Sequence, residues 1–222
     1  MAGVFNRPFG HEIGYSTSGL ESPERATIIQ YFFPDERDLG AMLTLRTKKE
    51  SPLAFLRLDA GLFAGNSINR ETDNRKDFIG RLGADKEIGN WGKWGAGISY
   101  YNGGVYNPTT TAYEMDGKRF IEVDKGETGT YMKREYIGMD AQFSFLSSWG
   151  TTSLRAEGLL GTQPGIASSS KVRIPEHVRR IFPKTRYSNA PLSVISSTWY
   201  RTSGLLHSLP YSNMMYTIRI RS

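Results

Sequence analysis

The sequence predicts an all-β protein, part of an antiparallel transmembrane β-barrel, with about seven strands in this chain. Two observations predict it. Apolar residues recur at every second position over strand-length segments, and short turns alternate with long polar loops. Because successive side chains of a strand point to opposite faces, each segment gains one apolar and one polar face. A barrel turns the first face to lipid and the second to a lumen.

Residues 53–64 show the alternation most clearly. Arg57 and Asp59 fall on one face, and the other face is apolar throughout: Ala54, Leu56, Leu58, Ala60, Leu62 and Ala64. The same pattern predicts strands within 41–48, 78–85, 93–101, 131–145 and 151–160. We also expect an earlier strand over Ala26–Phe33.

The connections between these segments fall into two kinds. Lys48–Pro52, Ile88–Trp91 and Leu146–Gly150 are short and rich in turn residues, whereas Gly65–Asp77 and Asn102–Gly129 are long, polar and charged. Short turns at one rim and long loops at the other are typical of outer-membrane barrels. Aromatic residues near the segment ends predict girdles at the membrane interface; these are Trp91, Trp94, Tyr100, Tyr101, Tyr131 and Trp149.

Composition narrows the class of protein. No run of 18 apolar residues exists, which excludes a transmembrane helix, and the mean hydropathy of -0.44 does not exclude strands with one lipid-facing side. Cysteine is absent, as suits export through an oxidising compartment, although a cytosolic protein needing no cysteine fits equally well. Residues 1–7 lack the basic and apolar regions of a signal peptide, so we expect the true start to lie upstream.

The positive charge is confined to the end of the chain. The net charge is +6, yet residues 166–222 carry nine basic residues and a single acid, Glu176, so that residues 1–165 are nearly balanced. This distribution argues against nucleic-acid binding. Glycine also nearly vanishes after Gly165. We therefore divide the chain into a barrel region, 1–165, and a basic, Gly-poor tail, 166–222, which we interpret as out of frame or disordered.

Several stretches of residues 4–165 resemble the phosphate-selective porin O and P family of Gram-negative outer-membrane barrels. They are Arg7-Pro8-Phe9-Gly10, Ser22-Pro23-Glu24-Arg25, the string from Phe33 to Gly40, Ser99-Tyr100-Tyr101-Asn102-Gly103-Gly104, the string from Lys133 to Gln142, and Gly161-Thr162-Gln163-Pro164. The resemblance implies seven or so strands of a larger porin barrel, embedded in outer-membrane lipid, passing small anions, and trimeric as a full-length parent.

The polar faces of the expected strands carry charges of both signs, which we expect to line the lumen: Arg46, Arg57, Asp59, Arg81, Asp85, Arg134, Asp140, Arg155 and Glu157. Arginines along a pore wall give anions a positive path. Alternatively, the arginines and carboxylates pair across strands and stiffen the wall. A channel with a weak preference for anions is compatible with both interpretations.

A second charged cluster follows from the family resemblance. The Arg7-Pro8-Phe9-Gly10 and Pro34–Gly40 strings resemble the start and end of the loop that narrows the pore in family members. We therefore expect a constriction formed by Arg7, Arg25, Glu36, Arg37 and Asp38. Surface ion pairs at an ordinary turn are the alternative.

Catalytic chemistry finds no support in the sequence. His11, His177 and His207 are isolated, and no triad, metal-ligand spacing or phosphate-binding loop can be assembled. We expect no enzyme activity, no cofactor and no metal. Two rivals to a porin stay open. One is a surface β-protein that binds a ligand such as a glycan through Tyr106, Tyr113, Arg119 and Phe120. The other is a soluble β-sandwich, whose apolar faces would bury each other.

Overall fold

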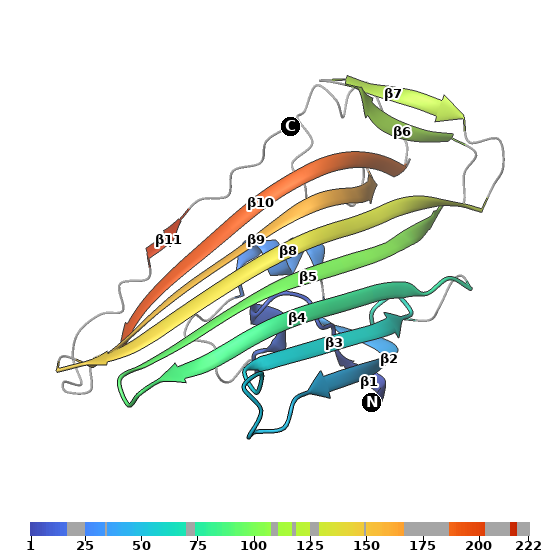
Figure 1. Ribbon diagram of the computed structural model, residues 1–222. Helices are drawn as coiled ribbons and strands as arrows, with labels where there is room; N and C mark the ends of the chain where they lie inside the picture. Colours follow the sequence, from blue (N-terminus) through green and yellow to red (C-terminus); the bar gives the residue numbers. More distant parts are fainter. Residues whose placement is uncertain are drawn as a thin grey trace.

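A computed structural model describes residues 1–16, 25–33, 35–69, 74–107, 111–116, 119–124, 129–148, 150–166, 187–202 and 214–216. The described chain is almost entirely β (Figure 1). Its first strands are β1 (Ala2–Asn6), β2 (Arg37–Arg46), β3 (Leu56–Phe63), β4 (Asp77–Ile88) and β5 (Gly92–Asn107). They are followed by β6 (Thr111–Asp116), β7 (Arg119–Asp124), β8 (Thr130–Ser147), β9 (Gly150–Ile166), β10 (Tyr187–Thr202) and β11 (Met214–Tyr216).

The strands form one curved sheet in the order β1-β2-β3-β4-β5-β8-β9-β10-β6-β7, with β11 paired to β10. From β1 to β9 every neighbouring pair is antiparallel, a run of seven strands. The predicted all-β class and antiparallel order are thus confirmed. Among the described residues the sheet is open, because β1 is paired only with β2 and β7 only with β6.

The strand register places the predicted apolar residues side by side on the convex face. Leu58, Leu82, Ile98 and Met139 are direct neighbours across four strands, and each is at least 40% exposed. The next positions along the strands, Asp59, Arg81 and Ser99, point to the concave face. Alternation in the sequence therefore assigned the two faces correctly for these strands.

The connections between strands also follow the expected asymmetry. β4 and β5 are joined at Gly89–Trp91, and β8 and β9 turn at Ser147–Gly150. The opposite ends of the strands carry the longer connections, and the described part of 102–129 contains the β6–β7 hairpin, which we expected to be loop. In residues 166–222, β10 pairs with β9 from Tyr187 to Thr202.

The expected strand over Ala26–Phe33 is wrong, because Thr27–Phe32 form a short helix, α1. Ile29, Phe32 and Phe33 are buried, whereas Gln30 between them is exposed. Spacing of three and four residues is helical and not strand-like. No helix of the described residues is long and apolar enough to cross a membrane.

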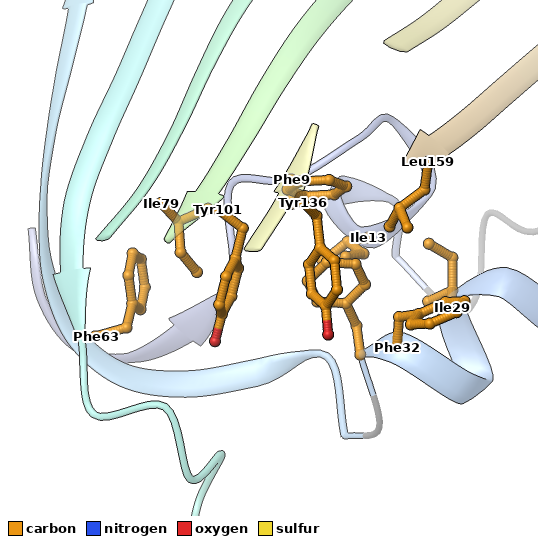
Figure 2. Close-up of a cluster of buried hydrophobic side chains, with 10 residues drawn as sticks. Phe9, Ile13, Ile29, Phe32, Phe63, Ile79, Tyr101, Tyr136 and Leu159 are labelled. Carbon is orange, nitrogen blue, oxygen red and sulfur yellow. The ribbon is translucent and has the colours of Figure 1, made fainter. Parts of the chain in front are cut away.

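A hydrophobic cluster joins α1 and residues 7–16 to the sheet (Figure 2). Phe9 and Phe33 approach each other with ring centroids 4.8 Å apart, and both contact Tyr136 of β8. The cluster comprises Phe9, Ile13, Ile29, Phe32, Phe33, Phe63, Ile79, Tyr101, Tyr136 and Leu159. Residues 7–16 and 25–33, called the inserted segment below, are thereby fixed against the concave face.

Candidate functional site: the concave face

The structure places every sequence-predicted lumen residue at a register position facing the concave side: Arg46, Arg57, Asp59, Arg81, Asp85, Arg134, Asp140, Arg155 and Glu157. It divides them, however, between two environments. Near the long-loop ends of the strands the face is covered by the inserted segment. Near the short turns it is an open groove. We call these the covered half and the open half.

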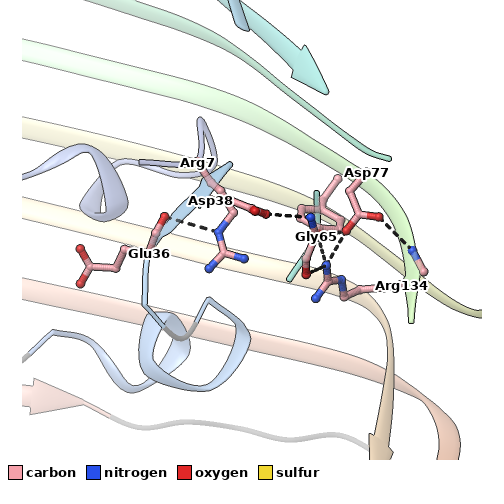
Figure 3. A network of polar contacts seen from close by, with 8 residues as sticks. Arg7, Glu36, Asp38, Gly65, Asp77 and Arg134 are labelled. Carbon is pink, nitrogen blue, oxygen red and sulfur yellow. Dashed lines mark hydrogen bonds and ion pairs between the residues drawn. The ribbon is translucent and has the colours of Figure 1, made fainter. Parts of the chain in front are cut away.

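Arg134 is the centre of the covered half (Figure 3). Its guanidinium pairs with Asp77 and donates to the carbonyl of Gly65 at 3.0 Å and to the hydroxyl of Tyr101. Tyr101 in turn donates to Asp77, which also accepts a hydrogen bond from the Gly104 amide. The Arg134 side chain is 13% exposed and Asp77 3%. This buried network ties β4, β5, β8 and the β3–β4 connection together.

Asp38 and Arg7 extend the network toward the inserted segment. The fully buried Asp38 carboxylate accepts a hydrogen bond from the Gly65 amide at 3.0 Å. Arg7 donates to the carbonyl of Glu36 at 3.4 Å and lies over the ring of Phe33. Desolvation by burial lowers the pKa of Arg7, an effect that the nearby Asp38 opposes.

The inserted segment is attached to the wall by polar contacts as well as by its aromatic rings. The Gly10 amide donates to the hydroxyl of Ser99 at 2.9 Å, and the Glu12 amide to Glu157 at 3.4 Å. Arg155 donates to the hydroxyl of Tyr15 at 2.9 Å. Gly10 has φ +64°, and a Cβ there would overlap the Glu157 carboxylate. Glycine is therefore required at this position for two reasons: it adopts the positive φ without strain, and it leaves room for the Glu157 carboxylate.

Within the inserted segment, Arg25 binds the two parts together. It pairs with Glu36 and donates to the carbonyls of Glu12 at 2.5 Å and Tyr15 at 2.8 Å. The Glu12 carboxylate accepts from the Ala26 amide at 2.7 Å. Burial nevertheless raises the pKa of Glu12, although this hydrogen bond and Arg25 act in the opposite direction.

A bidentate ion pair joins β4 to β8 at the middle of the wall. Arg81 donates to Asp140 through Nη2 at 2.7 Å and through Nε at 3.3 Å, and Gln142 also donates to Asp140 at 2.6 Å. The guanidinium lies over Gly83 and Gly97. A Cβ at either glycine would collide with it, so the two glycines clear the space in which the pair lies.

The open half contains a groove of about 910 Å³. Arg57 pairs with Asp59 at 2.6 Å, and Thr44 donates to Asp59 at 2.6 Å. Within the described residues, Arg46 and Lys93 are exposed cations without an ion-pair partner. Seven basic and two acidic residues line the groove: Arg7, Arg37, Arg46, Arg57, Arg81, Lys93 and Arg155, with Asp59 and Asp85.

The five residues expected at a constriction do not share one role. Arg7 and Asp38 are buried in the covered half, and Arg25 and Glu36 hold the inserted segment together. Arg37 is exposed and lines the groove.

Sequence reasoning missed Asp77, Ser99 and Tyr136, and it placed Tyr101 wrongly in an outer aromatic girdle. Tyr101 is 1% exposed and faces the concave side. Its register, one position beyond Tyr100, could have revealed this, because neighbouring residues face opposite sides. Trp149 and the motif residues Ser22–Glu24 lie outside the described residues.

Two further observations bear on chemistry and identity. Within the part of the chain that the structure describes, no three His, Asp or Glu side chains are grouped as metal ligands. No family model, curated protein or solved structure matches the chain. The family resemblance therefore stays a prediction.

Proposed function

We propose that this chain forms part of the wall of an outer-membrane porin, a passive diffusion channel for small anions, possessing no cofactor and no catalytic chemistry. The proposal includes lipid contact at the convex face, closure of the sheet by further strands, and association of closed barrels into trimers. A barrel spans lipid only when it is closed, because open edges leave backbone groups unpaired in hydrocarbon.

The observation that carries the proposal is the opposite character of the two faces of one sheet. On the convex face, β5, β8 and β9 present an apolar stretch at the same height, from Gly92 to Tyr100, Ile137 to Phe145 and Thr152 to Leu160. Each stretch is nine residues long, and about 9–11 residues suffice for a strand to cross a bilayer. Ion pairs occupy the other face. A soluble sandwich would instead need a second layer over the apolar face.

The excess of basic over acidic residues along the groove supports a preference for anions. Guanidinium groups replace part of the hydration shell that a phosphate or carboxylate loses on entering a pore. The pairs Arg57–Asp59 and Arg81–Asp140 neutralise some of this charge. We therefore expect a modest preference and not sharp selectivity.

Conductance in a planar bilayer tests the proposal. The closed barrel, with the edges of this sheet completed by further strands, should pass current and show a reversal potential of anion selectivity in a salt gradient. The variant R46E/K93E should shift the reversal potential toward cations, and D85N should shift it slightly toward anions. A barrel that inserts but passes no current would favour the alternative, a surface protein that binds a ligand such as a glycan through its long loops.

Lipid contact at the convex face has its own test. In β5, Ala96 and Asn102 point outward, at the centre of the apolar stretch and beyond its edge respectively. We expect A96R to weaken membrane insertion by about 2–4 kcal/mol and N102R by about 0–1 kcal/mol, because the cost of a charge depends on depth. Flotation with vesicles measures insertion. Equal effects of the two variants would contradict the proposed orientation.

A further inference from the structure

The apolar stretch of the convex face ends abruptly on the side of the long loops. Beyond Ile137 of β8, the next outward residues are Glu135 and Lys133, which form an ion pair. Beside them in β5, the hydroxyl of Tyr100 donates to Glu135 at 2.7 Å and accepts from the Asn102 amide group at 2.9 Å. The side chain of Lys133 remains 62% exposed. A bonded polar cluster thus follows directly on the lipid-facing surface.

A second cation, Arg75 of the β3–β4 connection, lies over Tyr131, the next outward residue of β8. The guanidinium of Arg75 is centred 4.4 Å from the ring of Tyr131, and the ring of Tyr106 meets Tyr131 edge to face at 6.1 Å. Tyr131 packs where a side chain of Gly104 would be, which places it on the outward side of the sheet. The aromatic pair therefore holds Arg75 at the outer surface, as aromatic faces commonly hold guanidinium groups.

We propose that Arg75 and Lys133 bind phosphate groups of lipid headgroups in the leaflet on the long-loop side; together with Tyr100 and Tyr131, which hold this surface in place, they are called the rim patch. The inference rests on the proposed function, since it requires lipid at the convex face. The partner is a lipid with a phosphate monoester, which carries more charge than a phosphodiester. Tyr131 and Lys133 are two residues apart on one strand, roughly 7 Å. This spacing allows both cations to reach one headgroup.

The opposite rim of the same face lacks this arrangement. Lys86 points outward there beside Trp94, and Phe143 lies against Trp91 and Phe145. These aromatics form an interfacial girdle, in which Lys86 lies beside Trp94. The rim patch instead combines two cations with two tyrosines, and one carboxylate, Glu135, offsets part of the charge. Lys86 therefore provides a matched control, an outward lysine at the other edge of the apolar stretch.

Lipid retention in mixed detergent micelles tests the rim patch with the full chain. The protein is purified with phosphatidylcholine alone, or with phosphatidylcholine containing a minority of phosphatidic acid, and the lipid that co-elutes is measured. We expect phosphatidic acid to be enriched over its share of the mixture. R75Q/K133Q should lose this enrichment, by about fivefold for each cation removed at an anionic lipid surface. K86Q should keep it.

Each outcome decides between the two proposals. The rim patch is supported if all variants retain phosphatidylcholine and only R75Q/K133Q loses the enrichment of phosphatidic acid. Equal lipid retention without enrichment, or equal loss in K86Q, overturns it while leaving the lipid-facing surface intact. A chain that stays monomeric without detergent and retains no lipid overturns the membrane proposal and the rim patch with it. Displacement of phosphatidic acid by inorganic phosphate alone would overturn the assignment to a lipid.

Discussion

The two halves of the concave face are built from the same strands, yet they differ in almost every physical respect. In the covered half, Arg134 and Asp77 are buried beneath aromatic rings, and each has several hydrogen-bond partners. In the open half, Arg57 is more than a third exposed and Arg46 faces a groove. The inserted segment and the β3–β4 connection at Gly65 create this difference, because they cover one half only.

Arginines on the same concave face therefore differ in their physical role, according to whether they are buried or exposed. A buried guanidinium that bonds to several strands fixes them in place, and its removal leaves a buried carboxylate without its cation. An exposed guanidinium adds little to stability but acts on ions that pass nearby. Arg134 and Arg81 form the expected cross-strand ion pairs, and the proposed anion path is left to Arg46 and its neighbours.

The sharpest test compares Arg134 with Arg57. We expect R134M to reduce stability by about 3–5 kcal/mol, because Asp77 would remain buried without its cation. R57M should cost clearly less, because Arg57 is more than a third exposed and the buried Asp59 keeps its hydrogen bond from Thr44. Urea unfolding in detergent measures both. Similar losses in the two variants would mean that the inserted segment does not desolvate the covered half.

The attachment of the inserted segment can be tested at its glycines. G10A should destabilise the segment by about 2–3 kcal/mol, because its backbone conformation disfavours alanine and the new Cβ would displace Glu157. Gly14 lies in the same segment with no atom near its Cβ position. G14A is therefore the control. Limited proteolysis should cut residues 7–16 faster in G10A alone, and equal rates would place the segment away from Glu157.

A smaller effect should appear in the pH dependence of stability. Burial raises the pKa of Glu12 in the folded protein above the ordinary value of 4.5. The folded state then holds this proton more tightly than the unfolded state, so the resulting stabilisation is present below the ordinary pKa and is lost as pH rises through the raised one. In E12Q, the contribution of Glu12 to the slope of unfolding free energy against pH should be absent. Unfolding midpoints between pH 4 and 8 measure it, and identical slopes in the two proteins would contradict the burial of Glu12.

Much of the sheet could be predicted from the sequence because alternation is a local property. Leu58, Leu82 and Ile98 each stand in a clear two-residue pattern, and the strand register then follows from short turns. The inserted segment could not be predicted in the same way. Its helix has no two-residue alternation, because the buried residues Ile29, Phe32 and Phe33 follow helical spacing.

The candidate site was predictable as a list of inward charges but not as two environments. Which arginine is buried depends on residues that come from elsewhere in the chain, such as Gly65 above Arg134. Asp77 was missed and Tyr101 was misplaced for the same reason, since their importance comes from contacts across several strands. Long-range packing, and not strand pattern, decides these roles.

The glycines beneath the Arg81–Asp140 pair restrict how this part of the sheet can vary between related sequences. Because a side chain at residue 83 or 97 would occupy the space of the guanidinium, these positions and the ion pair should change together between related sequences. A related sequence with a side chain at 97 should have lost the arginine at 81. Without that arginine, a carboxylate at 140 would be buried without its cation, so it should be lost as well. Four positions on three strands thus form one heritable unit.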